Sequence, residues 1–173
     1  IQKKGYFLKK INELEINAEE PWQEKHLRFL DNNYRKHPYY NEVMHEVETI
    51  FTKKYTLLIE VLTDSINACL KLFKITTPVK LQSTLAYNRE MQKSDLILAL
   101  LQSVGPTHYL SGKGAEAYMQ LNEFSAQNIK VDFQQFTHPV YPQKNSANFI
   151  PGIACLDVLF NVGPQQATGL IHA

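Results

Sequence analysis

Apolar residues recur at helical spacing through the first half of the chain. They fall every three or four positions between residues 22 and 37, from Val43 to Phe51, and from Leu58 to Phe73. This spacing places the apolar side chains on one face of a helix. A polar stretch over residues 52–56 separates the second run from the third. Three successive amphipathic helices are therefore predicted for this half.

Shorter stretches alternate between apolar and polar residues, which is typical of β-strands. Such strands are predicted at Lys10–Ile16, Val79–Leu85, Thr107–Leu110 and Ile129–Phe133. The last two flank Ala115–Gln127, whose apolar residues follow helical spacing. A strand–helix–strand crossover within one sheet makes its strands parallel and its connection right-handed. The two flanking strands are therefore expected side by side and parallel.

Two further helices have recognisable ends. Ser94 is a suitable N-cap for Asp95–Val104, because its hydroxyl can accept a hydrogen bond from an unpaired backbone N–H. Gly105-Pro106 then ends that helix. Ala154–Val162 reads as a short amphipathic helix that ends at Gly163-Pro164.

This order of elements predicts an α/β fold. We expect a helix-rich domain with a small, mostly parallel sheet in Rossmann-like layers. The chain has 173 residues, of which 44% are hydrophobic and 20% charged, as in ordinary globular proteins. No repeat or low-complexity linker divides it, so one domain is predicted over residues 1–173.

Charge and composition exclude several partner classes. The net charge of +1 gives no broad field for nucleic acid or an anionic membrane. The apolar runs at Leu57–Leu62 and Leu96–Leu101 are too short to span a bilayer. The start at Ile1 shows no secretory signal, so a cytoplasmic location is expected. Cys69 and Cys155 lie in apolar helical stretches and are predicted to be small buried thiols in a reducing compartment.

Ser111, Gly112, Lys113 and Gly114 form a turn between a predicted strand and a predicted helix. Glycines let a ligand approach the backbone closely, and a helix N-terminus offers free N–H groups to an anion. Lys113 adds a positive charge, so this turn is a candidate site for an anionic donor or a sugar nucleotide. The spacing is not that of a P-loop. A turn that needs glycine only for its geometry is the favoured alternative on these residues alone.

A polar, proline-rich loop follows the next strand and contains His138, Tyr141 and Gln143. Ligands of parallel sheets bind at the carboxyl ends of the strands, so this loop and the turn at 111–114 are expected to share one pocket. His138 could move a proton near neutral pH, with Tyr141 as a second catalytic residue. Gln143 would bind substrate, and Asp157 would support these residues from behind. The alternative is a stiff connection whose His and Tyr cap backbone groups.

The other histidines carry no comparable pattern. Glu42, His45 and Glu48 occupy neighbouring positions on a helix, but a metal needs more ligands than this face supplies. His26 and His37 lie on or just after a helix and are interpreted as structural or surface residues. No metal site is predicted, and no motif assigns a cofactor.

Several motifs, taken in order, resemble the WbqC-like family of bacterial proteins. They are Trp22, Lys25-His26, Tyr34-Arg35-Lys36, Pro38-Tyr39, Tyr109-Leu110-Ser111-Gly112, Gly114-Ala115, Tyr118, Phe124, Ile129, Val131, His138-Pro139-Val140-Tyr141, Gln143, Phe149, Pro151, Leu156-Asp157-Val158-Leu159-Phe160-Asn161 and Gly163. Ala154 departs from the family, which commonly has serine there. The family's usual opening segment, with Gln-Pro, Trp-Gly-Tyr and Asp-Asp motifs, has no match, so the chain resembles a domain that is incomplete at its N-terminus.

The resemblance also implies a function. The family is associated with O-antigen and other surface-polysaccharide gene clusters. The resemblance implies a transferase that places an amino acid such as glycine on a sugar. The alternative is a non-catalytic partner in a polysaccharide-assembly complex.

Overall fold

The computed structural model describes residues 1, 5–144 and 146–171. The chain divides into two compact units, each with its own cluster of buried apolar residues. Unit 1 comprises Ile1–Thr77 and His138–Ala173, and unit 2 comprises Pro78–Thr137. The single domain expected over the whole chain stays a prediction.

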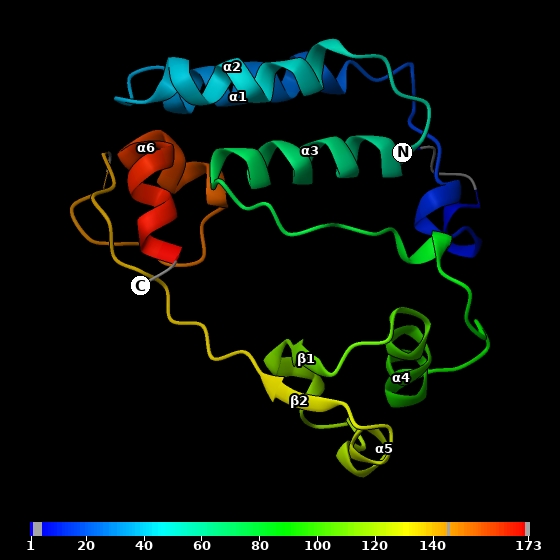
Figure 1. The fold of residues 1–173 in the computed structure, drawn as a ribbon. Helices are drawn as coiled ribbons and strands as arrows, with labels where there is room; N and C mark the ends of the chain where they lie inside the picture. The colour runs from blue at the N-terminus through cyan, green and yellow to red at the C-terminus, as the bar shows by residue number, and fades with distance from the viewer. Residues whose placement is uncertain (2–4, 145, 172–173) are drawn as a thin grey trace. The chain divides into compact units, whose positions relative to one another are not determined.

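Unit 1 is built from the long helices α1 (Trp22–Tyr34), α2 (Tyr40–Thr52), α3 (Leu58–Leu72) and α6 (Cys155–Ile171), as Figure 1 shows. The predicted helices of the first half are confirmed, although the first ends at Tyr34. Helix α2 contacts α1, α3 and α6. Its apolar stripe therefore forms the centre of the core of unit 1.

The core of unit 1 joins the beginning and the end of the chain. Val43 on α2 and both Leu159 and Phe160 on α6 have no exposed surface. The Phe160 ring stacks on the Tyr34 ring of α1 with centroids 4.5 Å apart. Burial of these side chains is the main force that holds α6 against α1 and α2.

Helix α6 bends at Gly163, where φ is 80° and ψ is 162°. The predicted end of a helix at Gly163-Pro164 is correct, but a second helical segment follows and reaches Ile171. Pro164 suits the first position of that segment, because a proline there lacks only an N–H that would be unpaired. The Tyr39 ring packs directly against Gly163, so a Cβ at this position would lie 2.6 Å from the ring.

Two predicted strands are wrong. Lys10–Ile16 contains the 3-10 helix Ile11–Glu13 and contributes one isolated bridge, between Glu15 and Leu57. The Glu13 carboxylate accepts the Lys10 N–H at 3.0 Å, which favours a local turn over an extended strand. Val79–Leu85 contains a second short 3-10 helix, Gln82–Thr84.

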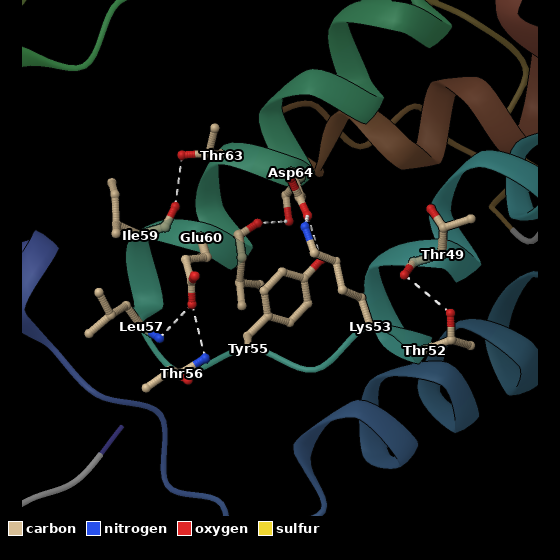
Figure 2. A network of polar contacts seen from close by, with 12 residues as sticks. Thr49, Thr52, Lys53, Tyr55, Thr56, Leu57, Ile59, Glu60, Thr63 and Asp64 are labelled. Atoms are coloured by element: carbon tan, nitrogen blue, oxygen red, sulfur yellow. Dashed lines mark hydrogen bonds and ion pairs between the residues drawn. The ribbon is translucent and has the colours of Figure 1, made fainter.

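Two carboxylates of α3 fix the connection between α2 and α3, which Figure 2 shows from close by. Asp64 accepts hydrogen bonds from the Lys53 ammonium at 2.7 Å and the Tyr55 hydroxyl at 2.8 Å. Glu60 accepts two backbone N–H groups, those of Thr56 at 2.9 Å and Leu57 at 2.8 Å. These bonds satisfy donors that a helix N-terminus otherwise leaves unpaired.

Replacing Glu60 by glutamine is expected to lower stability at neutral pH and to have little effect in acid. The two backbone N–H bonds hold the pKa of the Glu60 carboxyl below its ordinary value. A depressed folded-state pKa stabilises the protein above the unfolded pKa, and this contribution is lost as the pH falls through the folded pKa. Urea midpoints of the two proteins should therefore differ at pH 7 and converge at low pH. Glu48→Gln, at an exposed position of α2, is the control and should show no such convergence.

Unit 2 contains the predicted pair of parallel strands. Strands β1 (His108–Ser111) and β2 (Lys130–Phe133) pair in parallel, with Tyr109 opposite Val131. Helix α4 (Lys93–Val104) ends at Gly105 in the left-handed conformation, as predicted. The α/β class with a small parallel sheet is thus confirmed, and Rossmann-like layering stays a prediction.

The crossover between these strands differs from the prediction. Helix α5 covers only Leu121–Ala126, and Lys113–Ala115 form a 3-10 helix instead of the first turn of a longer α-helix. Ser94 does not cap α4, because the helix begins at Lys93 and Ser94 is its second residue. Its buried hydroxyl instead accepts the Gln120 N–H at 3.0 Å and so ties α4 to the start of α5.

Among the described residues, every helix falls short of the length and apolar character that crossing a membrane requires.

Candidate functional site

A buried carboxylate, Asp157, is the centre of a polar network in unit 1. It lies in the first turn of α6, where the helix dipole favours a negative charge. Its Oδ1 accepts the Tyr34 hydroxyl at 3.1 Å. Its Oδ2 accepts the Tyr141 hydroxyl at 2.8 Å and the Gln143 amide at 3.3 Å. These donors offset the cost of burying the carboxylate.

The two tyrosines of the network stay protonated over the physiological range. Burial raises the pKa of Tyr34 to about 12, and the charge of Asp157 adds to this effect. Burial also raises the pKa of Tyr141 to about 12, with the Gln143 amide opposing the shift and Asp157 reinforcing it. Both hydroxyls therefore donate to Asp157 and present only oxygen lone pairs to a ligand.

Side-chain amides fasten the loop after Tyr141 onto α6. The Gln143 amide pairs with both backbone groups of Ile150, donating to its carbonyl at 3.0 Å and accepting its N–H at 2.8 Å. Asn161 accepts the Lys144 N–H at 2.8 Å and donates to the Asp157 carbonyl at 2.8 Å. The loop is thus closed on itself and anchored beside Asp157.

A cavity of about 170 Å³ opens beside this network. It is lined by Asn33, Tyr34, His37, Gln143, Lys144, Ser146, Ile150, Ile153, Asp157 and Asn161. His37 is 93% buried, since its exposed fraction is 7%. Its Nδ1 has no hydrogen-bond partner in the part of the chain that the structure describes. A buried, unpaired ring nitrogen is costly, so a ligand or a water at this position would stabilise it.

The surroundings of the His37 imidazole favour its neutral form. Burial lowers its pKa, and the nearby positive charge of Lys144 lowers it further, although the Tyr34 carbonyl and Asp157 oppose this. A neutral imidazole has one nitrogen that accepts and one that donates a hydrogen bond. The cavity can therefore take a hydroxyl group at His37 and an anionic group near Lys144.

The sequence profile of the WbqC-like protein family matches residues 1–168. The chain belongs to this family. It is similar to the uncharacterized protein Rv1507c of Mycobacterium tuberculosis, with 26% identity over 166 residues, which cover 95% of this chain and 71% of that protein. No solved structure shows a significant match.

In this WbqC-like chain, three of the predicted site residues lie together. Tyr141, Gln143 and Asp157 meet in the network described above. His37 and Tyr34 line the same cavity, and the pattern of isolated polar residues had not singled them out for a site. Tyr34 belongs to the motifs of the family resemblance, whereas His37 lies between two of them, Tyr34-Arg35-Lys36 and Pro38-Tyr39, and is part of neither. His138 lies on an exposed loop of the same unit, and its catalytic role stays a prediction.

The remaining predicted residues lie in unit 2, where Ser111 is the last residue of β1 and Gly112, Lys113 and Gly114 follow the strand. Ser111 is buried, whereas the next three residues are exposed. The turn leads into a 3-10 helix, whose N–H groups at Ala115 and Glu116 donate to the carbonyls of Gly112 at 3.1 Å and Lys113 at 3.2 Å. The expected α-helical N-terminus for an anion is therefore absent from this turn. Convergence of the turn with His138, Tyr141 and Gln143 in one pocket stays a prediction.

No metal-binding group emerges from the described part of the chain, since nowhere in it do three His, Cys, Asp or Glu side chains gather as ligands would.

Proposed function

We propose that this WbqC-like chain is a cytoplasmic transferase of bacterial surface-polysaccharide biosynthesis, which binds a small polar group in the Asp157 cavity. The observation that supports this proposal best is the buried, unpaired Nδ1 of His37 in a cavity that it shares with Asp157, a carboxylate that accepts three hydrogen bonds. Sites that bind hydroxyl-rich ligands use a few fixed polar groups of this kind. Membership of the WbqC-like family supports the biosynthetic context.

The groups around the cavity suit transfer to a sugar hydroxyl. Neutral His37 would accept the proton of the attacking hydroxyl, which is the role of a general base. Lys144 would attract the anionic part of a donor, such as a phosphate or a carboxylate. Asp157 would keep Tyr141 in place beside the acceptor. The bond formed would join an amino acid such as glycine to the sugar.

The size of the cavity limits what it holds. Ligand pockets for whole drug-sized molecules usually measure about 300–1,000 Å³, whereas this cavity measures about 170 Å³. It suits one sugar ring or one aminoacyl group, and the rest of a sugar nucleotide would lie outside it. Donor contacts from Ser111, Gly112, Lys113 and Gly114, and proton transfer by His138, stay predictions.

A non-catalytic role in a polysaccharide-assembly complex is the alternative. An exposed apolar patch on the helices between Trp22 and Tyr40 would favour it. Phe29 on α1 is 61% exposed there, but its neighbour Leu30 is buried. A single exposed apolar side chain is common on soluble proteins, so the catalytic proposal is preferred.

A thermal-shift screen of the full-length protein tests the proposal. We expect one class of sugar, sugar nucleotide or aminoacyl donor to raise the melting temperature, because a ligand stabilises the folded state that binds it. His37→Gln should raise the dissociation constant of that ligand about tenfold, because one hydrogen bond worth roughly 1.4 kcal/mol is lost. The exposed His45 provides the matched control, and His45→Gln should bind normally.

Two results would argue against the site. One is that no compound of these classes shifts the melting temperature, and the other is that His37→Gln binds as tightly as the wild type. Once a ligand has been identified, His138→Gln should still bind it but should lose turnover if His138 transfers a proton in the reaction.

A further inference from the structure

Two cysteines that are far apart in the sequence meet in unit 1. Cys69 lies on α3 and Cys155 is the first residue of α6, and their sulfurs are 3.7 Å apart across a sequence separation of 86 residues. Cys155 is exposed and Cys69 is half-buried. The prediction of two small buried thiols is therefore wrong for Cys155.

We propose that Cys69 and Cys155 are a redox-active pair that closes to a disulfide by exchange with a low-molecular-weight disulfide. The geometry carries this inference. The sulfurs are in contact, one of them is exposed to solvent, and both belong to helices that already pack together. The inference does not depend on the proposed transferase function.

Cys155 is the attacking thiol. The hydrogen bond between the two sulfurs lowers the pKa of Cys155 to about 7, and the backbone N–H groups of Cys155 and Leu156 contribute, although burial opposes the shift. These N–H groups belong to the start of α6, where the helix dipole also favours a thiolate. The same hydrogen bond, together with burial, raises the pKa of Cys69. The two thiols therefore differ in reactivity at neutral pH.

The reaction takes two exchange steps. The Cys155 thiolate attacks one sulfur of a small disulfide, forms a mixed disulfide and releases one small thiolate. The Cys69 thiol then loses its proton to solvent and attacks the Cys155 sulfur. That step releases the second small molecule as a thiolate, which takes up a proton. Overall, the small disulfide is reduced to two thiols and the cysteine pair is oxidised.

The consequence for the fold is a covalent link between α3 and the first turn of α6. Asp157 lies two residues beyond Cys155 in that turn. The link lowers the conformational entropy of the unfolded chain between residues 69 and 155. The oxidised protein should therefore have the higher free energy of unfolding.

Oxidised glutathione provides the test on the full chain. After incubation at pH 7, free thiols are alkylated and the intact mass and peptide masses are measured. The wild type should lose both alkylatable thiols, carry no glutathione and melt at a higher temperature. Cys69→Ser should stop at one glutathione on Cys155. In Cys155→Ser, Cys69 should react at least about tenfold more slowly than Cys155 does in Cys69→Ser. Cys69→Ala and Cys155→Ala replace any serine variant that does not fold.

Three outcomes would overturn the proposal. The first is a wild-type protein in which both cysteines are still alkylated after prolonged incubation. The second is a glutathione adduct on the wild type that never resolves. The third is a disulfide that forms only between two copies of the chain.

Discussion

Replacing Gly163 by alanine is expected to lower the free energy of unfolding by about 2–5 kcal/mol. The residue has φ 80° and ψ 162°, a conformation that is essentially restricted to glycine. A Cβ would also lie 2.6 Å from the Cδ1 and Cε1 atoms of Tyr39. The Tyr39 ring packs against the core, and the backbone N–H of Tyr39 donates to the Phe160 carbonyl at 3.3 Å. Neither the ring nor the bend can therefore shift without disturbing α6.

Urea unfolding of both proteins, followed by circular dichroism, measures this effect. Gly169 offers a matched control on the same helix, because a Cβ there meets no atom within 4 Å. Gly169→Ala is expected to be neutral or to stabilise the protein by up to about 1 kcal/mol. Equal unfolding energies for the two variants would show that the contact with Tyr39 does not constrain Gly163.

The elements that could be predicted from the sequence are those whose pattern repeats over several turns. Helices α2 and α3, of 13 and 15 residues, carry apolar stripes that recur over several turns, and a random sequence rarely sustains such a period. The parallel pair β1 and β2 could be predicted because the connection between two strands determines their relative direction. Gly105 ended α4 as expected, since left-handed backbone conformation is a local property of glycine.

The short elements could not be predicted, because tertiary contacts decide them. A short alternating stretch fits a strand and a 3-10 helix equally well, and the Glu13 side chain favours the 3-10 helix within Lys10–Ile16. The helix expected over Ala115–Gln127 is interrupted where the Gln120 N–H binds the Ser94 hydroxyl. Those two residues are 26 positions apart, so no local pattern reveals the bond.

The candidate site shows the same division. Asp157 could be assigned a supporting role, since an acidic residue on an apolar helix needs partners. Its partner Tyr34 lies 123 residues earlier in the chain, and nothing in the local sequence links the two. His37 follows α1 without a neighbouring motif of its own. Residues of α6 and of the loop after Tyr141 line the cavity with it, and only the fold brings them together.

Replacing Asp157 by asparagine is expected to destabilise the protein by about 2–4 kcal/mol. The carboxylate accepts three hydrogen bonds, and an asparagine would set an N–H₂ group against donors that already point at it. The matched control is Asp95→Asn, an exposed aspartate in the first turn of α4. It should cost less than about 1 kcal/mol, the range of a helix-dipole interaction.

The same variant should change the alkaline limb of the stability profile. In the wild type, Tyr34 and Tyr141 have pKa values raised from 10.0 to about 12. A raised folded-state pKa stabilises the protein fully below the unfolded pKa, and this contribution is lost as the pH rises through the folded pKa. Asp157→Asn removes one of the causes of the shift but leaves burial, so both tyrosines should ionise at a lower pH. Ultraviolet titration of tyrosinate measures this directly.

Titration and unfolding together distinguish an Asp157-centred network from simple packing. If Asp157 merely fills space, asparagine of the same shape should unfold at nearly the same urea concentration and leave both tyrosine pKa values in place. If Asp157 organises the cavity, Tyr141→Phe should lower stability by only about 1 kcal/mol, since two donors would still reach the carboxylate. The remaining Tyr34 should then keep its raised pKa, because both burial and the charge of Asp157 persist. A fall in the pKa of Tyr34 in that variant would show that the network depends on the loop rather than on the carboxylate.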